Sequence, residues 1–411
     1  MLAAPAAMSA GRGHAQTPMT LKASYSTSAF DKLMAQAGAL YARRGTTIVE
    51  FLRPTPENHD AHLKQTLLRA VTGGLPDVSF QANNHVARLV RSTIAQPLDA
   101  FANSDPDWSA VGTSAVGRVG RVNGIVYGIP FQISVPICMV NLDLAARAGV
   151  APDAIPQDWP GLLSLAKQIT ALGSRLVGGF FDFGAAWTFQ ALVTAQGGRM
   201  ATPDGRKVAF DGAEGLAALQ VVRGFGEAGM VDMTQSQALQ AFGAGMIGVL
   251  ATSNNVLAGL EQQAGDRFRI GTVPWPLTSP EGRVPAGGRT GVIFTRDAAR
   301  QAAAWDFLRF MSSPEVQTLV VKATGAIPVD PDAVEAPERL GRFYAEHPNH
   351  RAGLARSRQL TGWYSYPGDN TAEITDVMIE HLRSVAARTV APEPALEAMR
   401  RDVQALLPAT L

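Results

Sequence analysis

Residues 20–80 alternate between short β-branched stretches and longer helical patterns, and this alternation constrains the fold more than any other feature. The patterns predict strands at 20–25, 46–51 and 76–80, separated by helices at 28–44 and 58–71. Strands that alternate with helices over so short a stretch form parallel sheets with right-handed crossovers. An α/β architecture is therefore expected from the first eighty residues.

The second of these helices carries an apolar stripe formed by Leu63, Leu67, Leu68 and Val71, which we expect to pack against the sheet. In open parallel sheets, ligands bind beyond the carboxyl ends of the strands. Three candidate binding residues follow or face those ends, namely Tyr25, His59 and Asn83.

Residues 123–150, NGIVYGIPFQISVPICMVNLDLAARAGV, organise the rest of the chain. An Asn-Gly turn signal opens the segment, and Pro130 and Pro136 interrupt its β-rich part. Proline lacks the N–H group that a central strand needs, so the segment is a poor central strand. We interpret it as extended chain that leaves one sheet and enters another.

Length and composition exclude several classes of protein. A chain of 411 residues exceeds the size of most single cores, so two domains are expected. The net charge of +1 offers no electrostatic footprint for nucleic acid. No apolar run approaches the roughly 18 residues of a membrane span. The single cysteine, Cys138, lies in an apolar run without basic neighbours and is expected to be buried and inert.

The first sixteen residues, MLAAPAAMSAGRGHAQ, are rich in small side chains and end in a stretch that suits secretory cleavage before Gln16. A basic region and a long apolar region are missing. Residues 1–16 are therefore interpreted either as the remnant of a signal peptide or as a disordered terminus.

A family resemblance extends from about Leu21 to about Leu407. It rests on the order and spacing of several segments: AVTGGLPDVSF, YGIPFQISVPICMVNLDLAARAGV, DWPGLLSLAKQI, GMIGVLATSNNVL, FRIGTVPWPLTSPEGRVPAGGRTGVIF, AWDFLRFMSSPEVQTLVVKATGAIPV and FYAEHPNH. In these segments the chain resembles the extracellular solute-binding proteins of ABC importers, within the group that binds sugars and glycerol phosphate.

The resemblance implies a two-lobe periplasmic binding protein fold, in which each lobe is a mostly parallel sheet flanked by helices and hinge crossings join the lobes. We expect residues 17–128 and 287–335 in the N-terminal lobe, and residues 129–286 and 336–411 in the C-terminal lobe. Such a protein is not an enzyme and holds neither cofactor nor metal. It works as a periplasmic or extracellular monomer whose partners are a small solute and the membrane subunits of a permease.

The resemblance also assigns ligand-binding positions. Gln132 and Ser134 follow the first crossing, Trp187 matches an aromatic residue that stacks on ligand, and Ser253 or Thr252 ends a strand. Gly287 and Gly288 offer backbone N–H groups where a side chain would block the ligand. Trp363, Tyr364 and Asn370 are candidates from the C-terminal part of the chain.

Four other signals have an ordinary structural explanation that we prefer. The glycine triplets at 224–229 and 243–248 lack the strand before and helix after that a dinucleotide site needs. The pairs His59–His62 and His347–His350 lack a third metal ligand and are expected at the surface. Asp182, set among phenylalanines, could act as a general acid, but a loop aspartate that accepts hydrogen bonds is favoured. Trp275, between two prolines, is expected in the core.

The nature of the ligand stays open at this point. Aromatic faces interspersed with Asn, Gln and Ser suit sugars. Residues 361–375 contain no Arg or Lys, where glycerol-phosphate binders of the resembling group carry an arginine. A neutral sugar or polyol is therefore preferred to glycerol 3-phosphate or a glycerophosphodiester, although Arg289 or His59 could serve an anion. A carbohydrate-active enzyme and a chemosensory adaptor remain as alternatives.

Overall fold

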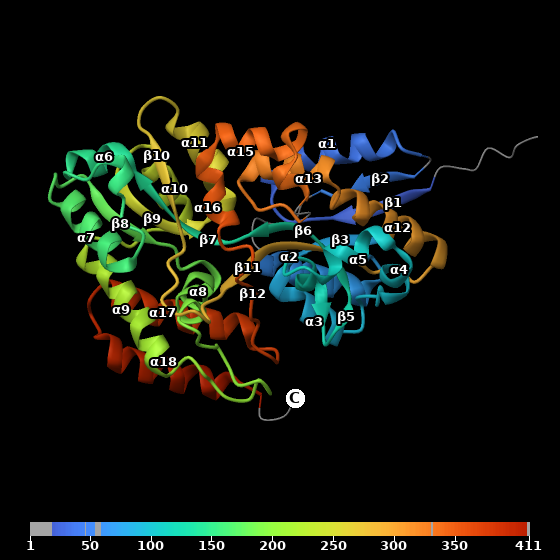
Figure 1. The fold of residues 1–411 in the computed structure, drawn as a ribbon. Helices are drawn as coiled ribbons and strands as arrows, with labels where there is room; N and C mark the ends of the chain where they lie inside the picture. The colour runs from blue at the N-terminus through green and yellow to red at the C-terminus, as the bar shows by residue number, and fades with distance from the viewer. Residues whose placement is uncertain (1–18, 46, 54–58, 330–331, 409–411) are drawn as a thin grey trace, which may run out of the picture.

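The computed structural model describes residues 19–45, 47–53, 59–329 and 332–408. The segment interpreted as a signal-peptide remnant, residues 1–16, lies outside them. The described chain forms two α/β lobes that lie side by side, each built on its own sheet (Figure 1). We call the lobe around the six-stranded sheet the first lobe and the lobe around the four-stranded sheet the second lobe.

The sheet of the first lobe has the order β12-β11-β3-β1-β2, and β6 also pairs with β11. Its strands are β1 (Thr20–Ser24), β2 (Ile48–Phe51), β3 (Val78–Ala82), β6 (Gly128–Ser134), β11 (Val284–Ile293) and β12 (Leu360–Gly362). As the alternating pattern predicted, β1 is parallel to both β2 and β3. Strand β11 is antiparallel to β3 and β6, so the sheet is mixed.

The sheet of the second lobe has the order β10-β7-β9-β8. Its strands are β7 (Pro136–Asn141), β8 (Val177–Phe181), β9 (Ile247–Ser253) and β10 (Ile270–Pro274). Only β8 and β9 are parallel, whereas β7 is antiparallel to both neighbours. The expectation of a mostly parallel sheet is wrong for this lobe. The chain passes directly from β6 into β7 through Val135 without a crossover helix, so the direction of β7 is set by its entry.

Helices flank both sheets (Figure 1). Those of the first lobe are α1 (Asp31–Ala42), α2 (His59–Thr72), α3 (Val86–Arg91), α4 (Asp99–Ser104), α5 (Pro106–Thr113), α12 (Ala298–Met311) and α13 (Pro314–Thr324). Those of the second lobe are α6 (Leu142–Arg147), α7 (Trp159–Thr170), α8 (Trp187–Ala195), α9 (Ala213–Glu227), α10 (Gln235–Gly243), α11 (Leu257–Ala264), α17 (Thr371–Ala386) and α18 (Pro392–Leu406). Short helices α14 (Asp332–Glu335), α15 (Arg342–Glu346) and α16 (Arg351–Leu354) precede β12. No helix within the described residues is long and apolar enough to cross a membrane.

The two lobes have separate apolar cores. In the second lobe, Trp275 is fully buried, as expected for a core residue, and its ring contacts that of Trp159 edge-on at 4.8 Å between centroids. Cys138 is also fully buried, and burial raises the pKa of its thiol. The prediction of an inert cysteine is therefore confirmed.

The apolar stripe predicted on α2 is only partly buried. Leu63 and Leu67 pack in a small cluster with residues of α3, but Leu68 is 63% exposed and Val71 is 87% exposed. The helix buries a polar face instead. His62 and Thr66 point into the lobe, where Nε2 of His62 lies 3.3–3.4 Å from polar atoms of residues on β1 and β3.

The chain passes between the lobes at several places within the described residues. The first is Val135, between β6 and β7, and the second leads from β10 into β11. The third follows Gly325, whose φ of +95° ends α13, and it is held to β6 by a bridge between Ile133 and Ile327. The residue boundaries that the sequence predicted for the two lobes stay a prediction.

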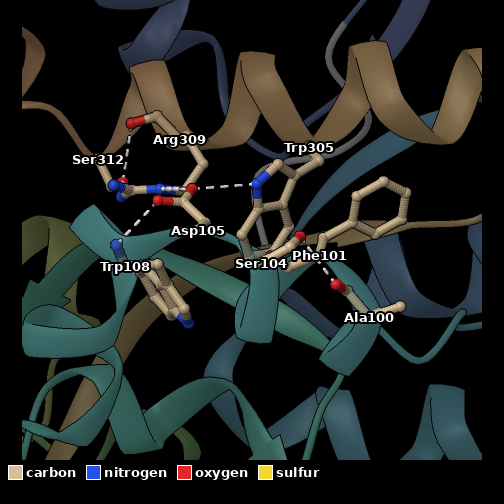
Figure 2. Close-up of polar contacts among 8 residues, drawn as sticks. All are labelled: Ala100, Phe101, Ser104, Asp105, Trp108, Trp305, Arg309 and Ser312. Atoms are coloured by element: carbon tan, nitrogen blue, oxygen red, sulfur yellow. Dashed lines mark hydrogen bonds and ion pairs between the residues drawn. The ribbon is translucent and has the colours of Figure 1, made fainter.

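A polar cluster in the first lobe ties α5 to α12 (Figure 2). The carboxylate of Asp105 accepts hydrogen bonds from Nε of Arg309 at 2.8 Å and from Nε1 of Trp305 at 3.2 Å. Its other oxygen accepts from the backbone N–H of Trp108, at the start of α5. Arg309 thus has a carboxylate partner although it is largely buried.

The stability of the first lobe is expected to fall at acidic pH. Burial favours the neutral forms of Asp77 and Asp105, but hydrogen bonds from Arg300 and Arg309 outweigh it and hold the pKa of each carboxyl below its usual value. A pKa that is lower in the folded chain than in the unfolded chain gives stability above the unfolded value, and this stability is lost as the pH falls. Denaturant unfolding should therefore show a declining free energy below about pH 4, with a shallower decline in Asp77→Asn. An identical decline in the variant would contradict this assignment.

Candidate functional site

Polar and aromatic side chains from both lobes meet where β6 and β11 approach α8. We call this group the cleft cluster, and it comprises His59, Gln132, Ser134, Trp187, Gly287, Arg289 and Trp363. All but Arg289 are among the binding residues predicted from the sequence. The cluster lies beside the carboxyl end of β3, since Arg289 is the register partner of Ala82, the last residue of that strand.

Three rings form the aromatic part of the cleft cluster. The ring of Trp363 lies between those of His59 and Trp187, at centroid distances of 6.0 and 6.1 Å. His59 begins α2 in the first lobe, and Trp187 begins α8 in the second. The rings thus join the two lobes. Burial, followed by the charge of Arg289, lowers the pKa of His59 well below its usual value, so its imidazole is neutral at pH 7.

The two adjacent glycines on β11 have different roles. A Cβ atom on Gly287 would lie 2.9 Å from Cζ2 of Trp187 and 2.9 Å from Oγ of Ser134, so the absence of a side chain lets α8 approach the strand. Gly288 has a φ of +105°, and a Cβ there would collide with the backbone carbonyl of Gln132. Its role is to let β11 pass β6 at a register shift.

Tyr25 and Asn83 are near the cleft cluster, but their polar groups are already occupied. The hydroxyl of Tyr25 donates to Asp31 at 2.7 Å. The amide of Asn83 donates to the carbonyl oxygens of Ala286 and Gly287 and accepts from Thr290. Asn83 therefore positions β11 behind the glycine pair. Whether either residue touches a ligand remains a prediction.

The structure does not bring Ser253 or Asn370 into the cleft cluster. The hydroxyl of Ser253 accepts from the backbone N–H of Asn255 and caps the turn after β9. The amide of Asn370 donates to the carbonyl of Leu406 at the end of α18. Both contacts are structural, and the binding role expected for these two residues remains untested.

Several buried polar atoms of the cleft cluster have no hydrogen-bond partner among the residues that the structure describes. They are Nδ1 of His59, Nε2 of Gln132, Nε1 of Trp187 and Nε of Arg289. Buried polar groups in folded proteins are nearly always paired, so their convergence at one place calls for a partner. A bound solute with several oxygen atoms would supply it.

A cavity of about 150 Å³ adjoins the cleft cluster. Its walls come from α2 and α3 in the first lobe, from α8 and α17 in the second, and from residues 363–369. Trp363 belongs to both the cavity wall and the aromatic group. Gln190 holds this wall in place, because its side chain donates to the carbonyl of Gly362 and accepts from the N–H of Tyr364.

The other chemical candidates have structural explanations. Asp182 accepts hydrogen bonds from Thr252, Gln235 and the N–H of Gly184, which confirms the expected loop aspartate. The expectation of surface histidines is wrong for His62 and His350, which are buried. Polar side chains from β1 and β3 surround His62, and Nε2 of His350 lies 2.9 Å from Glu261. The described residues contain no group of three or more His, Cys, Asp or Glu that could hold a metal.

Sequence reasoning named Arg289 only as an exception and missed Gln190. A signal for Arg289 was available, because it is the one charged residue in the otherwise small and apolar run PAGGRTGVIF. Charged side chains are seldom fully buried without a reason. No comparable signal marks Gln190, since its bonds depend on how a distant segment folds over α8.

Comparison with protein families shows the family to which this chain belongs. Residues 55–352 match the family model described as bacterial extracellular solute-binding protein. The chain belongs to this family. It is a family of binding proteins rather than enzymes. The resemblance inferred from the sequence segments is thereby confirmed.

Curated relatives of this solute-binding protein include sn-glycerol-3-phosphate-binding periplasmic proteins, named UgpB. The Rhizobium meliloti (strain 1021) protein is 23% identical over 281 residues, which cover 66% of this chain and 63% of the relative. The Salmonella typhimurium (strain LT2) protein is 22% identical over 366 residues, covering 83% of this chain and 81% of the relative. The match thus spans less than two thirds of the Rhizobium protein.

Solved structures show the same fold. UgpB from Mycobacterium tuberculosis, in complex with glycerophosphocholine, superposes with a TM-score of 0.79 at 19% identity, covering 95% of this chain and 98% of that one. The sugar-binding protein MalE from Xanthomonas citri gives a TM-score of 0.78 at 16% identity, covering 94% and 97%. These likenesses establish the periplasmic binding protein fold for this solute-binding protein.

Proposed function

We propose that this protein is the solute-binding component of an ABC importer and captures a small carbohydrate or polyol, free or phosphorylated, between its two lobes. It then delivers the solute unchanged to the membrane subunits of a permease, acting as a periplasmic monomer. Relatives named for sn-glycerol 3-phosphate and for sugars support this range of solutes.

The observation that carries the proposal is the cleft cluster itself. Its aromatic rings come from both lobes, and unpartnered donors surround them. Sugars and polyols present apolar C–H faces to aromatic rings and hydroxyl groups to such donors. A site assembled from two lobes is complete only when the lobes are together.

Closure of the two lobes gives the solute-loaded protein a shape that the permease recognises. The lobes are joined by short segments such as Val135, and a rotation about a few residues in them would open the cleft. A solute that contacts both lobes binds the closed form better and shifts the population towards it. The permease then distinguishes loaded from empty protein by shape.

A thermal-shift screen of the purified protein tests the proposal. The panel contains sugars, polyols, sugar phosphates and glycerophosphodiesters. A solute at ~100 times its dissociation constant adds about 2.7 kcal/mol of stability and raises the melting temperature clearly. Recovery of the solute unchanged separates binding from catalysis. Absence of any stabilising solute across the panel would contradict the proposal.

Replacement of Trp187 tests the aromatic part of the site. Trp187→Ala should weaken affinity for the solute found in the screen by roughly 1–3 kcal/mol, because a stacking face is lost. Trp187→Phe keeps a smaller face and should lose less. Titration calorimetry measures both variants, and circular dichroism checks their folding. Unchanged affinity in folded Trp187→Ala would remove this residue from the site.

A further inference from the structure

Arg289 is a buried guanidinium without a carboxylate partner. Its side chain, on β11, is 5% exposed. Nη1 donates to Oε1 of Gln132 at 3.0 Å, Nη2 lies 3.5 Å from Oγ of Ser26, and the guanidinium carbon lies 4.1 Å from the ring centroid of Phe30. Throughout the described residues, no ion pair connects Arg289 to an acidic side chain.

Two other arginines of the same lobe show the contrast. Arg309 binds Asp105 at 2.8 Å (Figure 2), and Arg300 binds Asp77 at 2.7 Å. Both are more exposed than Arg289, yet both have a carboxylate. Within the described part of the chain, the charge that is most costly to bury is therefore the one without a carboxylate partner.

The groups around Arg289 do not neutralise it. His59 and His62 are its titratable neighbours, and burial followed by the charge of Arg289 lowers the pKa of both, to about 4 for His62. Both imidazoles are thus neutral at pH 7. Gln132, Ser26 and the face of Phe30 are dipolar or aromatic contacts, which solvate a cation without balancing its charge.

Donors without partners surround the same guanidinium. Among the described residues, Nε of Arg289 and the amide nitrogen of Gln132 have no hydrogen-bond partner, and neither has Nδ1 of His59, which donates or accepts according to the tautomer. An arginine presents its N–H groups in a planar fork that fits the oxygens of a phosphate or carboxylate. The site thus offers both a charge and hydrogen-bond donors suited to an oxyanion.

We propose that Arg289 binds an oxyanion of the solute, so that the natural ligand is a polyol or sugar carrying a phosphate or carboxylate group. This inference rests on the proposed function, which it makes more specific. The preference for a neutral solute depended on the missing cation at residues 361–375. Here the cation comes from β11 in the first lobe.

Matched pairs of solutes test the inference by titration calorimetry on the full chain. The probes are glycerol 3-phosphate with glycerol, glycerophosphocholine, and glucuronate with glucose. We expect at least one anionic probe to bind roughly tenfold or more tighter than its neutral counterpart. Arg289→Gln should then weaken that probe by the same factor, roughly tenfold or more, and abolish the preference. Whether the phosphate monoester, the phosphodiester or the carboxylate binds best identifies the anion.

The control variant is Arg296→Gln. Arg296 is exposed, follows β11 in the same lobe and donates a hydrogen bond to a backbone carbonyl. The Arg296→Gln variant therefore loses the same charge from outside the cleft cluster. Its affinity should stay within about twofold of the wild type. An equal loss in both variants would mean that long-range charge rather than contact matters, and would overturn the role of Arg289.

A structural role for Arg289 predicts a different result in a second variant. Since the charge has no partner, Arg289→Met should keep or raise the melting temperature of the free protein while losing the anionic probe. A clear fall in melting temperature would indicate a structural residue. Tighter binding of a neutral solute than of every anionic probe, or equal affinity of wild type and Arg289→Gln for the anionic probe, would overturn this inference and leave solute binding intact. If no probe binds, the proposed function fails as well.

Discussion

Gly288→Ala is expected to lower the free energy of unfolding by roughly 3 kcal/mol or more. Two costs add at this position. The φ of +105° belongs to a region that residues with a Cβ rarely adopt, and the new Cβ would collide with the carbonyl of Gln132 on β6. A backbone atom cannot rotate away as a side chain does, so β11 and β6 would have to separate.

Gly362→Ala is the matched control. Gly362 also lies in a strand of the same sheet, but a Cβ there meets nothing within 4 Å. Its stability should change by less than about 1 kcal/mol. Chemical denaturation followed by circular dichroism measures both variants. Equal stability of Gly288→Ala and Gly362→Ala would mean that the strain at Gly288 is relieved elsewhere.

The elements that the sequence predicted well are those whose local pattern and tertiary role agree. The parallel arrangement of β1, β2 and β3 follows from short strands alternating with helices, because a crossover helix permits little else. Helix α7 begins where Asp158 caps it, with a proline in the first turn, as such a sequence favours. Pro130 within β6 and Pro136 at the start of β7 indicated the passage between the lobes.

The sequence predictions fail where contacts between residues far apart in the sequence determine the structure. Helix α2 has an apolar stripe, but part of it faces solvent because Ser24, Ser79 and Gln81 form a polar network that binds His62 and Thr66. No local sequence pattern shows which face of a helix packs against a sheet. The antiparallel β7 likewise depends on how the chain enters the second sheet.

The structure brings several of the predicted site residues together, and their contact with a solute stays a prediction. Gln132, Trp187, Gly287 and Trp363 meet, although they lie far apart in the sequence. Tyr25 and Asn83 lie nearby with their hydrogen bonds already made. The charge of Arg289 could not be weighed from the sequence, since only the fold shows that no carboxylate of the described residues forms an ion pair with it.

Gly287→Val is expected to weaken solute binding about 100-fold, equivalent to roughly 2.7 kcal/mol, while leaving the protein folded. Gly287 has an ordinary strand conformation, so the backbone accepts a β-branched residue. The new side chain would instead meet the hydroxyl of Ser134 on β6, which can rotate away, and the indole of Trp187, which belongs to the second lobe. If the lobes move relative to each other, the clash is relieved by opening, and the variant is held in the form that binds solute poorly.

Three measurements separate this effect from simple damage to the site. Calorimetry should show the loss of affinity, with Gly287→Ala intermediate and Gly362→Val close to wild type. Thermal unfolding without solute should change little, in contrast to Gly288→Ala. Small-angle scattering with saturating solute should show compaction in the wild type and none in Gly287→Val. A variant that binds weakly but still compacts would mean that Gly287 serves local ligand contact and that closure does not depend on its contact with Trp187.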